Sequence, residues 1–149
     1  MKTEKPILGT LVSGTLRPED LIPAFAGELR RIRGALPRSL ANEVRAFNAG
    51  KYDTDHGCDV ELVNELIDAL NEYAPDYCYF GAHPSDGADF GFWLHEDWQQ
   101  MAKDDGVPFV ASMADAAEAP IVCEVSDHGN ATLYARTKGG EYREIWSVV

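Results

Sequence analysis

The chain has 149 residues, of which 45% are apolar and 26% are charged, as is usual for a folded globular protein. This length predicts a single domain, residues 1–149, with a core that needs no disulfide bonds. The net charge of −12 argues against a nucleic-acid-binding protein, because phosphates would be repelled. No apolar run approaches the ~18 residues of a membrane helix. The three widely spaced cysteines are typical of reduced thiols, so we expect a cytoplasmic protein.

The acidic residues are concentrated in one part of the sequence. Residues 52–135 contain 18 Asp or Glu and a single basic side chain, Lys103, which gives a net charge of −17. Residues 1–51 carry a charge of +4 and residues 136–149 a charge of +1. A segregated negative field favours a basic binding partner.

The first predicted helix begins around residues 17–20, where Pro18 and two acids suit a first helical turn. Pro23 is compatible with this helix only if the regular helix starts as late as Asp20, which places the proline in the first turn. A second helix is expected over Leu40 to Phe47. The apolar residues of the first helix recur at helical spacing and should be buried: Leu21, Ile22, Phe25, Leu29 and Ile32.

A third helix is predicted from Asp59, as N-cap, to about residue 74, because Pro75 follows. Its apolar stripe is Val63, Leu66, Ile67, Leu70 and Tyr73. Another side carries four acids at spacings of four, three and four residues, which repel one another weakly. Such a row is either a solvated helix face or a partner-binding face; the four acids are Glu61, Glu65, Asp68 and Glu72.

Residues 77–94 predict a β-hairpin whose loop is residues 84–88. Pairing His83 with Asp89 gives each strand one apolar face, and a shift by one residue would mix the faces. In this register Phe80 lies opposite Phe92, with Phe90 on the same buried face. The other face pairs Tyr79 with Trp93 and Gly81 with Gly91, which leaves a notch beside the aromatic pair.

The remaining sequence predicts a short helix at residues 96–103, a brief strand at 107–110 and a meander of three strands at 121–126, 131–137 and 142–148. Strands thus follow one another in hairpins rather than alternating with helices. We therefore expect an α+β fold in which N-terminal helices pack on a mainly antiparallel sheet, formed by the hairpin 77–94 and the C-terminal meander.

Residues 53–61 suggest a metal site, because Asp53, Asp55, Gly57, Asp59 and Glu61 alternate like the ligands of a calcium loop. The sixth position, which should be glycine, is Cys58, and the twelfth, which should be a bidentate acid, is Asn64. His56 and Cys58 lack a second pair to complete a zinc site. We expect no metal and no cofactor.

The hairpin offers two alternative roles for its polar and aromatic side chains. His83 with Asp89 is either a cross-strand pair that fixes the loop or a general acid–base pair. Tyr79 and Trp93 are either cover for the strand glycines or a protein-binding hot spot. No catalytic residue is assigned, and we expect that the protein is not an enzyme.

Three segments of the sequence carry a resemblance: residues 17–23, residues 79–93 and residues 127–134. They resemble small proteins of unassigned function that phages and mobile elements encode. The resemblance implies a bacterial cytoplasm as the setting, where small acidic proteins such as anti-CRISPR and DNA-mimic antirestriction proteins block host defence enzymes.

The resulting hypothesis is an acidic inhibitor that binds a basic, nucleic-acid-binding host defence protein by phosphate mimicry. It binds neither nucleic acid nor membrane itself. The alternative is a small enzyme or ligand-binding domain that uses the notch near His83 and Asp89. The expected partner-binding residues are Glu61, Glu65, Asp68, Glu72, Tyr79, His83, Asp86, Asp89 and Trp93.

Overall fold

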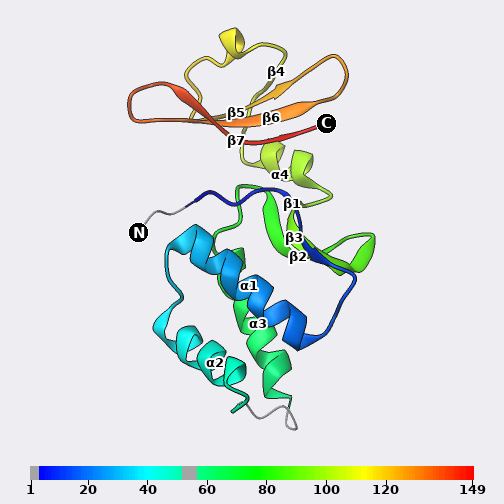
Figure 1. The fold of residues 1–149 in the computed structure, drawn as a ribbon. Coiled ribbons are helices and arrows are strands. Elements are labelled where there is room, and N and C mark those ends of the chain that lie inside the picture. The colour runs from blue at the N-terminus through cyan, green and yellow to red at the C-terminus, as the bar shows by residue number, and fades with distance from the viewer. Residues whose placement is uncertain (1–3, 52–56) are drawn as a thin grey trace. The chain divides into compact units, whose positions relative to one another are not determined.

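The structure is a computed structural model that describes residues 4–51 and 57–149 (Figure 1). Its elements are, in order, β1 (Gly9–Ser13), α1 (Pro18–Arg33), α2 (Arg38–Asn48), α3 (Cys58–Asn71), β2 (Cys78–His83), β3 (Asp86–Leu94), α4 (Trp98–Asp104), β4 (Phe109–Val110), the short 3₁₀ helix η1 (Met113–Asp115), β5 (Ile121–Val125), β6 (Ala131–Arg136) and β7 (Tyr142–Val148). Among the helices described, none is both long and apolar enough to cross a membrane.

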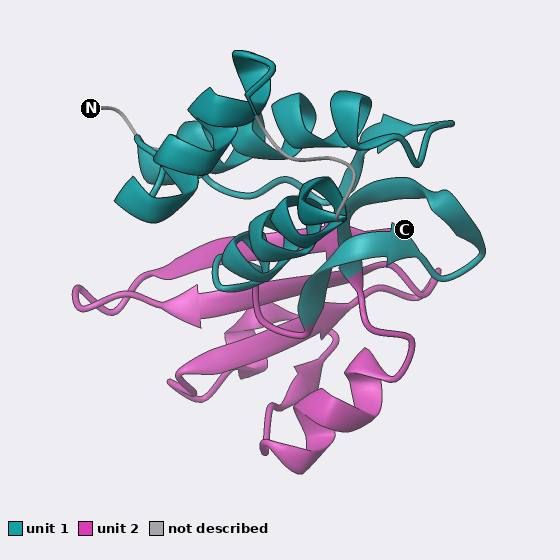
Figure 2. Cartoon of the chain, turned by 90° about the horizontal axis from the view of Figure 1, so that it is seen from below, with its two compact units in different colours: residues 1–74, 78–93 teal, residues 75–77, 94–149 magenta. Residues whose placement is uncertain are grey.

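The chain divides into two compact units, which Figure 2 shows in different colours. Unit 1 comprises residues 1–74 and 78–93, and unit 2 comprises residues 75–77 and 94–149. The predicted α+β class is confirmed. The hairpin and the meander, however, belong to two different sheets: β1-β3-β2 and β4-β5-β6-β7. The expectation of one shared sheet was wrong, because the hairpin pairs with a strand that the sequence analysis missed.

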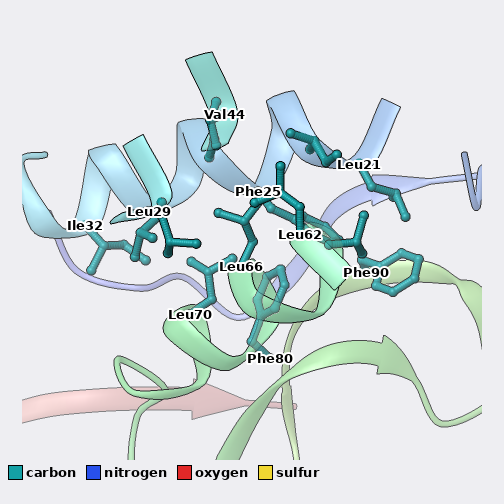
Figure 3. Close-up of a cluster of buried hydrophobic side chains, with 14 of the residues drawn as sticks. Leu21, Phe25, Leu29, Ile32, Val44, Leu62, Leu66, Leu70, Phe80 and Phe90 are labelled. Carbon is teal, nitrogen blue, oxygen red and sulfur yellow. The ribbon is translucent and has the colours of Figure 1, made fainter. Parts of the chain in front are cut away.

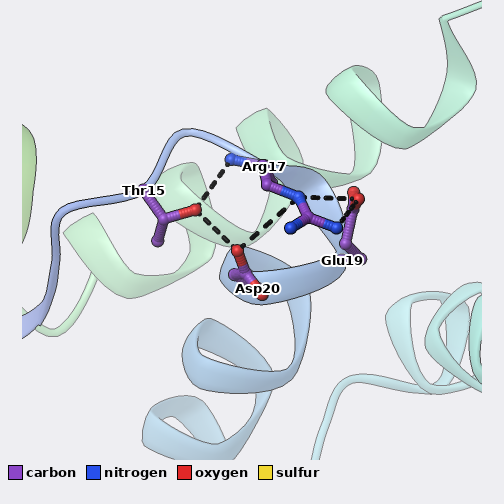
Figure 4. A network of polar contacts seen from close by, with 4 residues as sticks. All are labelled: Thr15, Arg17, Glu19 and Asp20. Atoms are coloured by element: carbon purple, nitrogen blue, oxygen red, sulfur yellow. Dashed lines mark hydrogen bonds and ion pairs between the residues drawn. The ribbon is translucent and has the colours of Figure 1, made fainter.

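Helix α1 begins at Pro18, within the predicted range of residues 17–20 but before Asp20, the latest start that would place Pro23 in the first turn. Figure 4 shows the polar contacts that hold this end of the helix: Thr15 Oγ1 donates to Asp20 Oδ2 (2.7 Å) and accepts from the Arg17 amide (3.1 Å). The Arg17 guanidinium bonds Glu19 at 2.6 Å. Pro23 therefore lies inside the helix and not in its first turn, which corrects the expectation. Its side chain is exposed there, and one backbone hydrogen bond to the preceding turn is lost.

Helix α3 begins one residue before the predicted N-cap. Gly57, in the left-handed conformation (φ 75°), occupies the cap position, and Asp59 lies in the first turn. The helix ends at Asn71, whose side-chain amide bonds both backbone groups of Phe80, at 2.8 Å to the N–H and 2.9 Å to the C=O. Asn71 thus ties α3 to β2 and satisfies polar groups on an edge strand.

The core of unit 1 lies between α1, α2 and α3 and the buried face of the sheet. Figure 3 shows Phe25 of α1, Leu62 and Leu66 of α3 and Phe80 of β2 pointing toward one another. The Phe25 and Phe80 rings meet edge-on, with centroids 5.2 Å apart. The predicted burial of the apolar stripe of α1 and of the three phenylalanines of the hairpin is confirmed. The buried residues of this core include Leu21, Ile22, Phe25, Leu29, Ile32, Leu66, Leu70, Phe80, Phe90 and Phe92.

The sheet of unit 1 contains strand β1, which pairs antiparallel with β3. Thr10 lies opposite Gly91 and Val12 opposite Phe90. A β-carbon on Gly91 would lie 1.9 Å from the carbonyl oxygen of Gly9. Glycine is therefore required at position 91, because the backbone of β1 occupies the space of a side chain.

The hairpin turn consists of residues 84 and 85, so His83 and Asp86 flank it. The predicted loop of five residues is wrong, because residues 86–88 belong to β3. Within this part of the strand, the Asp86 side chain accepts a hydrogen bond from the Ala88 amide (3.0 Å). On the β1 side of the central strand β3, Asp89 lies opposite Ser13.

Unit 2 is built on the predicted meander, β5-β6-β7, with β4 added parallel to β5. Its aromatic centre is Trp98 of α4, which meets Trp146 edge-on at 5.0 Å and stacks on Phe109 at 6.0 Å. The Trp146 indole N–H donates to the Asp76 carbonyl (2.9 Å), which fixes residue 76 within this unit.

Candidate protein-binding face

The acidic side chains of α2, of α3 and of the residue that caps the end of α3 form what we call the acidic face: Glu43, Glu61, Glu65, Asp68 and Glu72. The four predicted acids are all exposed, as expected for either a solvated or a partner-binding face. Glu43 was not predicted. It comes from α2, which packs on α3, and it is half-buried.

Glu65 of α3 is the group that affects the Glu43 carboxyl most. One carboxyl oxygen of Glu43, Oε2, is shielded from solvent and has no N–H or O–H donor among the described residues. When protonated, Glu43 can donate a hydrogen bond to Glu65, and this, together with burial and the negative charges of Glu65 and Glu61, raises the pKa of Glu43 to about 7. Two neighbouring carboxyl groups cannot both ionise readily, so the acidic face keeps a proton at pH values where a glutamic acid side chain is ordinarily ionised.

The acidic face has no basic partner within the described residues. In residues 4–51 and 57–149, no lysine or arginine forms an ion pair with its five carboxylates. Two arginines of unit 1 form ion pairs elsewhere: Arg31 pairs with Glu28 and with Glu4, and Arg17 with Glu19. Among the described residues of unit 1, no ion pair therefore compensates the negative charge of the acidic face.

The raised pKa makes the stability of unit 1 depend on pH. Protonated Glu43 is favoured in the folded chain, so its contribution is complete below pH ~4.5 and is lost as the pH rises through about 7. Glu43→Gln keeps the hydrogen bond without the charge. At pH 8 it should raise the free energy of unfolding by about 1 kcal/mol, allowing for solvent screening.

The measurement is thermal unfolding of wild type and Glu43→Gln at pH 5 and pH 8. We expect the two proteins to differ less at pH 5 than at pH 8. Asp68→Asn, which removes the same charge from an exposed position, should not reproduce this pH dependence. Equal stability of Glu43→Gln and wild type at pH 8 would contradict the raised pKa of Glu43.

The aromatic side chains of the hairpin use their polar groups inside the hairpin. Tyr79 donates its hydroxyl to the Ala82 carbonyl (2.8 Å), and Trp93 donates its indole N–H to the Gly81 carbonyl (3.0 Å). The His83 ring meets Trp93 edge-on at 4.7 Å. Tyr79, His83 and Trp93 are all half-buried, so each presents part of its ring to solvent in a fixed orientation.

The glycine notch of the sequence analysis is filled. The Tyr79 ring lies about 3.5 Å from where a β-carbon of Gly81 would be, and the Gly9 backbone abuts Gly91. No hydrogen bond or ion pair joins His83 to Asp89, both of which are described, and His83 Nδ1 accepts from the Ser85 amide instead (3.0 Å). His83 and Asp89 therefore do not form the direct contact of an acid–base pair.

Metal ligands do not gather in the part of the chain that is described, where no group of three or more His, Cys, Asp or Glu could hold a metal ion. Asp53, Asp55 and His56 of the weighed calcium and zinc sites lie outside the described residues. Burial raises the pKa of Cys123 to about 11, which keeps this thiol protonated and unreactive.

Comparison of the chain with family models, with curated proteins and with solved structures finds no match.

Proposed function

We propose that the chain binds and blocks a basic, nucleic-acid-binding protein of a bacterial defence system, with its acidic face lying where phosphates normally bind. The resemblance to proteins of phages and mobile elements supplies the bacterial setting. The acidic face is complementary in charge to a cationic protein surface.

The row of exposed acids along α3, with Glu43 of the packed helix α2 beside it, carries this proposal. Five carboxylates on two packed helices and the C-cap of α3 form no ion pair with a basic side chain in residues 4–51 and 57–149, and the pKa of Glu43 among them is raised to about 7. An Arg or Lys side chain of a partner would lower that electrostatic cost and form charge-assisted hydrogen bonds with the carboxylates. Binding should therefore release a proton, and it should be fast and sensitive to salt.

The hairpin supplies a second contact of a different kind. Tyr79 and Trp93 expose parts of rings whose polar atoms are already bonded. Rigid aromatic rings give contact area at little cost in entropy and are enriched at the centres of protein interfaces. Asp86 and His83 at the turn complete the proposed contact, and Asp89 is a backbone neighbour of Ser13 behind it.

The charge of the acidic face should matter for binding and not for folding. The fourfold variant changes Glu61, Glu65 and Glu72 to Gln and Asp68 to Asn. Its melting temperature should equal that of wild type or be slightly higher, and its free energy of unfolding should rise by at most about 1 kcal/mol, because like charges no longer repel. Differential scanning calorimetry at pH 8 measures this. A loss of several degrees would show that the carboxylates support the fold.

Affinity capture from a bacterial lysate tests the function. The bait proteins are wild type, the fourfold variant and a control of equal charge with four changes in unit 2: Glu96→Gln, Asp97→Asn, Asp127→Asn and Glu141→Gln, all exposed. Wild type and control should capture the same basic protein after nuclease treatment, and added DNA or RNA should displace it. The fourfold variant should capture much less.

Three outcomes would reject the proposed function. In the first, the fourfold variant captures as much partner protein as wild type does. In the second, nuclease treatment abolishes the capture. In the third, the isolated protein itself binds DNA or RNA.

A further inference from the structure

Unit 2 contains an open cavity of about 430 Å³, and none of the residues that line it belongs to the acidic face. Most of its lining is apolar, with Met101, Val107, Pro108 and Ile121 among the residues. The polar lining includes Tyr77 and Asp105, whose side chains bond each other. This volume is at the lower end for ligand pockets, which suits a single side chain or a small molecule and not a nucleotide.

The backbone at Tyr77 is held in an unusual conformation that places the ring at the cavity. Its φ of 65° lies in the left-handed region, which is costly for a side chain of this size. Two hydrogen bonds hold the backbone on either side: His95 donates its amide to the Tyr77 carbonyl (2.9 Å), and Trp146 donates to the preceding carbonyl. The ring position is thus set by the rest of unit 2.

The Tyr77 hydroxyl donates a hydrogen bond of 2.8 Å to Asp105 Oδ2. Burial first, and then this bond, raise the pKa of Tyr77 to about 12, so the hydroxyl stays a donor at every physiological pH. One oxygen of Asp105 is therefore oriented by the tyrosine, and the other is available to a ligand.

Asp105 has no cationic partner among the described residues, and it follows the last turn of α4, where the carbonyl groups already carry negative charge. Lys103, the basic residue of that helix, has its ammonium group 5.5 Å from the centre of the Phe109 ring instead. Unit 2 as a whole has 11 acidic and four basic residues. A positive charge at Asp105 would therefore be attracted by the carboxylate, by the carbonyl end of α4 and by the net negative charge of unit 2.

From the apolar lining and the oriented carboxylate, we infer that this cavity binds an ammonium or guanidinium group on an aliphatic stem, as in a lysine or arginine side chain. The stem packs against the apolar lining, and the cation bonds Asp105. The inference concerns unit 2 alone, so it holds or fails independently of the acidic face in unit 1.

The test is an NMR titration of the full chain with blocked single amino acids: N-acetyl-arginine methylamide, N-acetyl-lysine methylamide and, as the neutral analogue, N-acetyl-norleucine methylamide. The two cationic probes should give saturable shifts of the Gly106 and Val107 amides, at millimolar concentrations in keeping with their size. The norleucine probe should bind at least ten-fold more weakly.

Two variants with the same change of charge decide whether Asp105 holds the cation. Asp105→Asn, at an exposed position that tolerates substitution, should weaken the cationic probes at least ten-fold. Asp104→Asn is the matched control, because Asp104 bonds Gln100 and does not line the cavity, so it should leave binding unchanged. Equal binding of the norleucine probe, unchanged binding to Asp105→Asn, or shifts that do not saturate would overturn the inference.

Discussion

Replacing Phe80 with alanine should lower the free energy of unfolding of unit 1 by about 3–5 kcal/mol, the range for removing a core aromatic ring. The side chain is 1% exposed, and its ring meets Phe25 at 5.2 Å and Phe92 at 4.9 Å. The surrounding helices and strands are fixed by other contacts, so they should not collapse into the cavity. Phe80→Leu, which retains most of the volume, should cost less than half as much.

Denaturant unfolding followed by circular dichroism at 222 nm measures this effect. Of the four α-helices that the structure describes, the three longest belong to unit 1, so the helical signal reports chiefly on that unit. A cost below about 1 kcal/mol for Phe80→Ala would mean that this ring is not at the centre of a packed core.

Gly91→Ala should be similarly severe, although it adds only one carbon atom. The added β-carbon would lie 1.9 Å from the Gly9 carbonyl oxygen and 2.9 Å from its carbon, both of which are backbone atoms. Either β1 moves away from β3 or the sheet distorts, and we expect a cost of about 3 kcal/mol, at the upper end for overpacking.

Gly87→Ala is the matched control for Gly91→Ala, because it lies in the same strand and its β-carbon meets nothing within 4 Å. It should change stability by less than about 0.5 kcal/mol. Hydrogen exchange should show lost protection across β1 in Gly91→Ala alone. Native-like protection of β1 in that variant would contradict the close approach of the two strands.

The sequence predicted those parts of the fold that depend on local periodicity. The bounds of β7 agree with the prediction, and β5 and β6 each end one residue earlier. The helical spacing from Leu21 to Ile32 identified the buried stripe of α1. Alternation identified Phe80, Phe90 and Phe92 as core residues, although the turn is shorter than predicted, since β3 begins at Asp86.

Features that depend on tertiary contacts were missed. Strand β1 is five residues long with no clear alternation in burial, and only its pairing with β3 defines it. The requirement for glycine at position 91 follows from that pairing. Tyr77 and Asp105 are 28 residues apart in sequence, and no local pattern connects them.

The acidic face was predicted in part, since the four acids of α3 follow from helical spacing alone. Glu43 carried a signal that was not used. It lies three residues after Leu40 and four before Phe47, on the apolar stripe of α2, where an acid must come close to the neighbouring helix. Which charges it would meet there depends on how α2 packs against α3.

Titration of the Glu43 side chain by NMR, with and without a nona-arginine peptide, tests the central claim most directly. Free protein should give a midpoint near pH 7, and bound peptide should lower it by at least one unit, because the arginines neutralise Glu65 and Glu61 and release the proton of Glu43. A midpoint near the ordinary value of ~4.5 in the free protein, or one near 7 that bound peptide leaves unchanged, would contradict an acidic face built for a cationic partner.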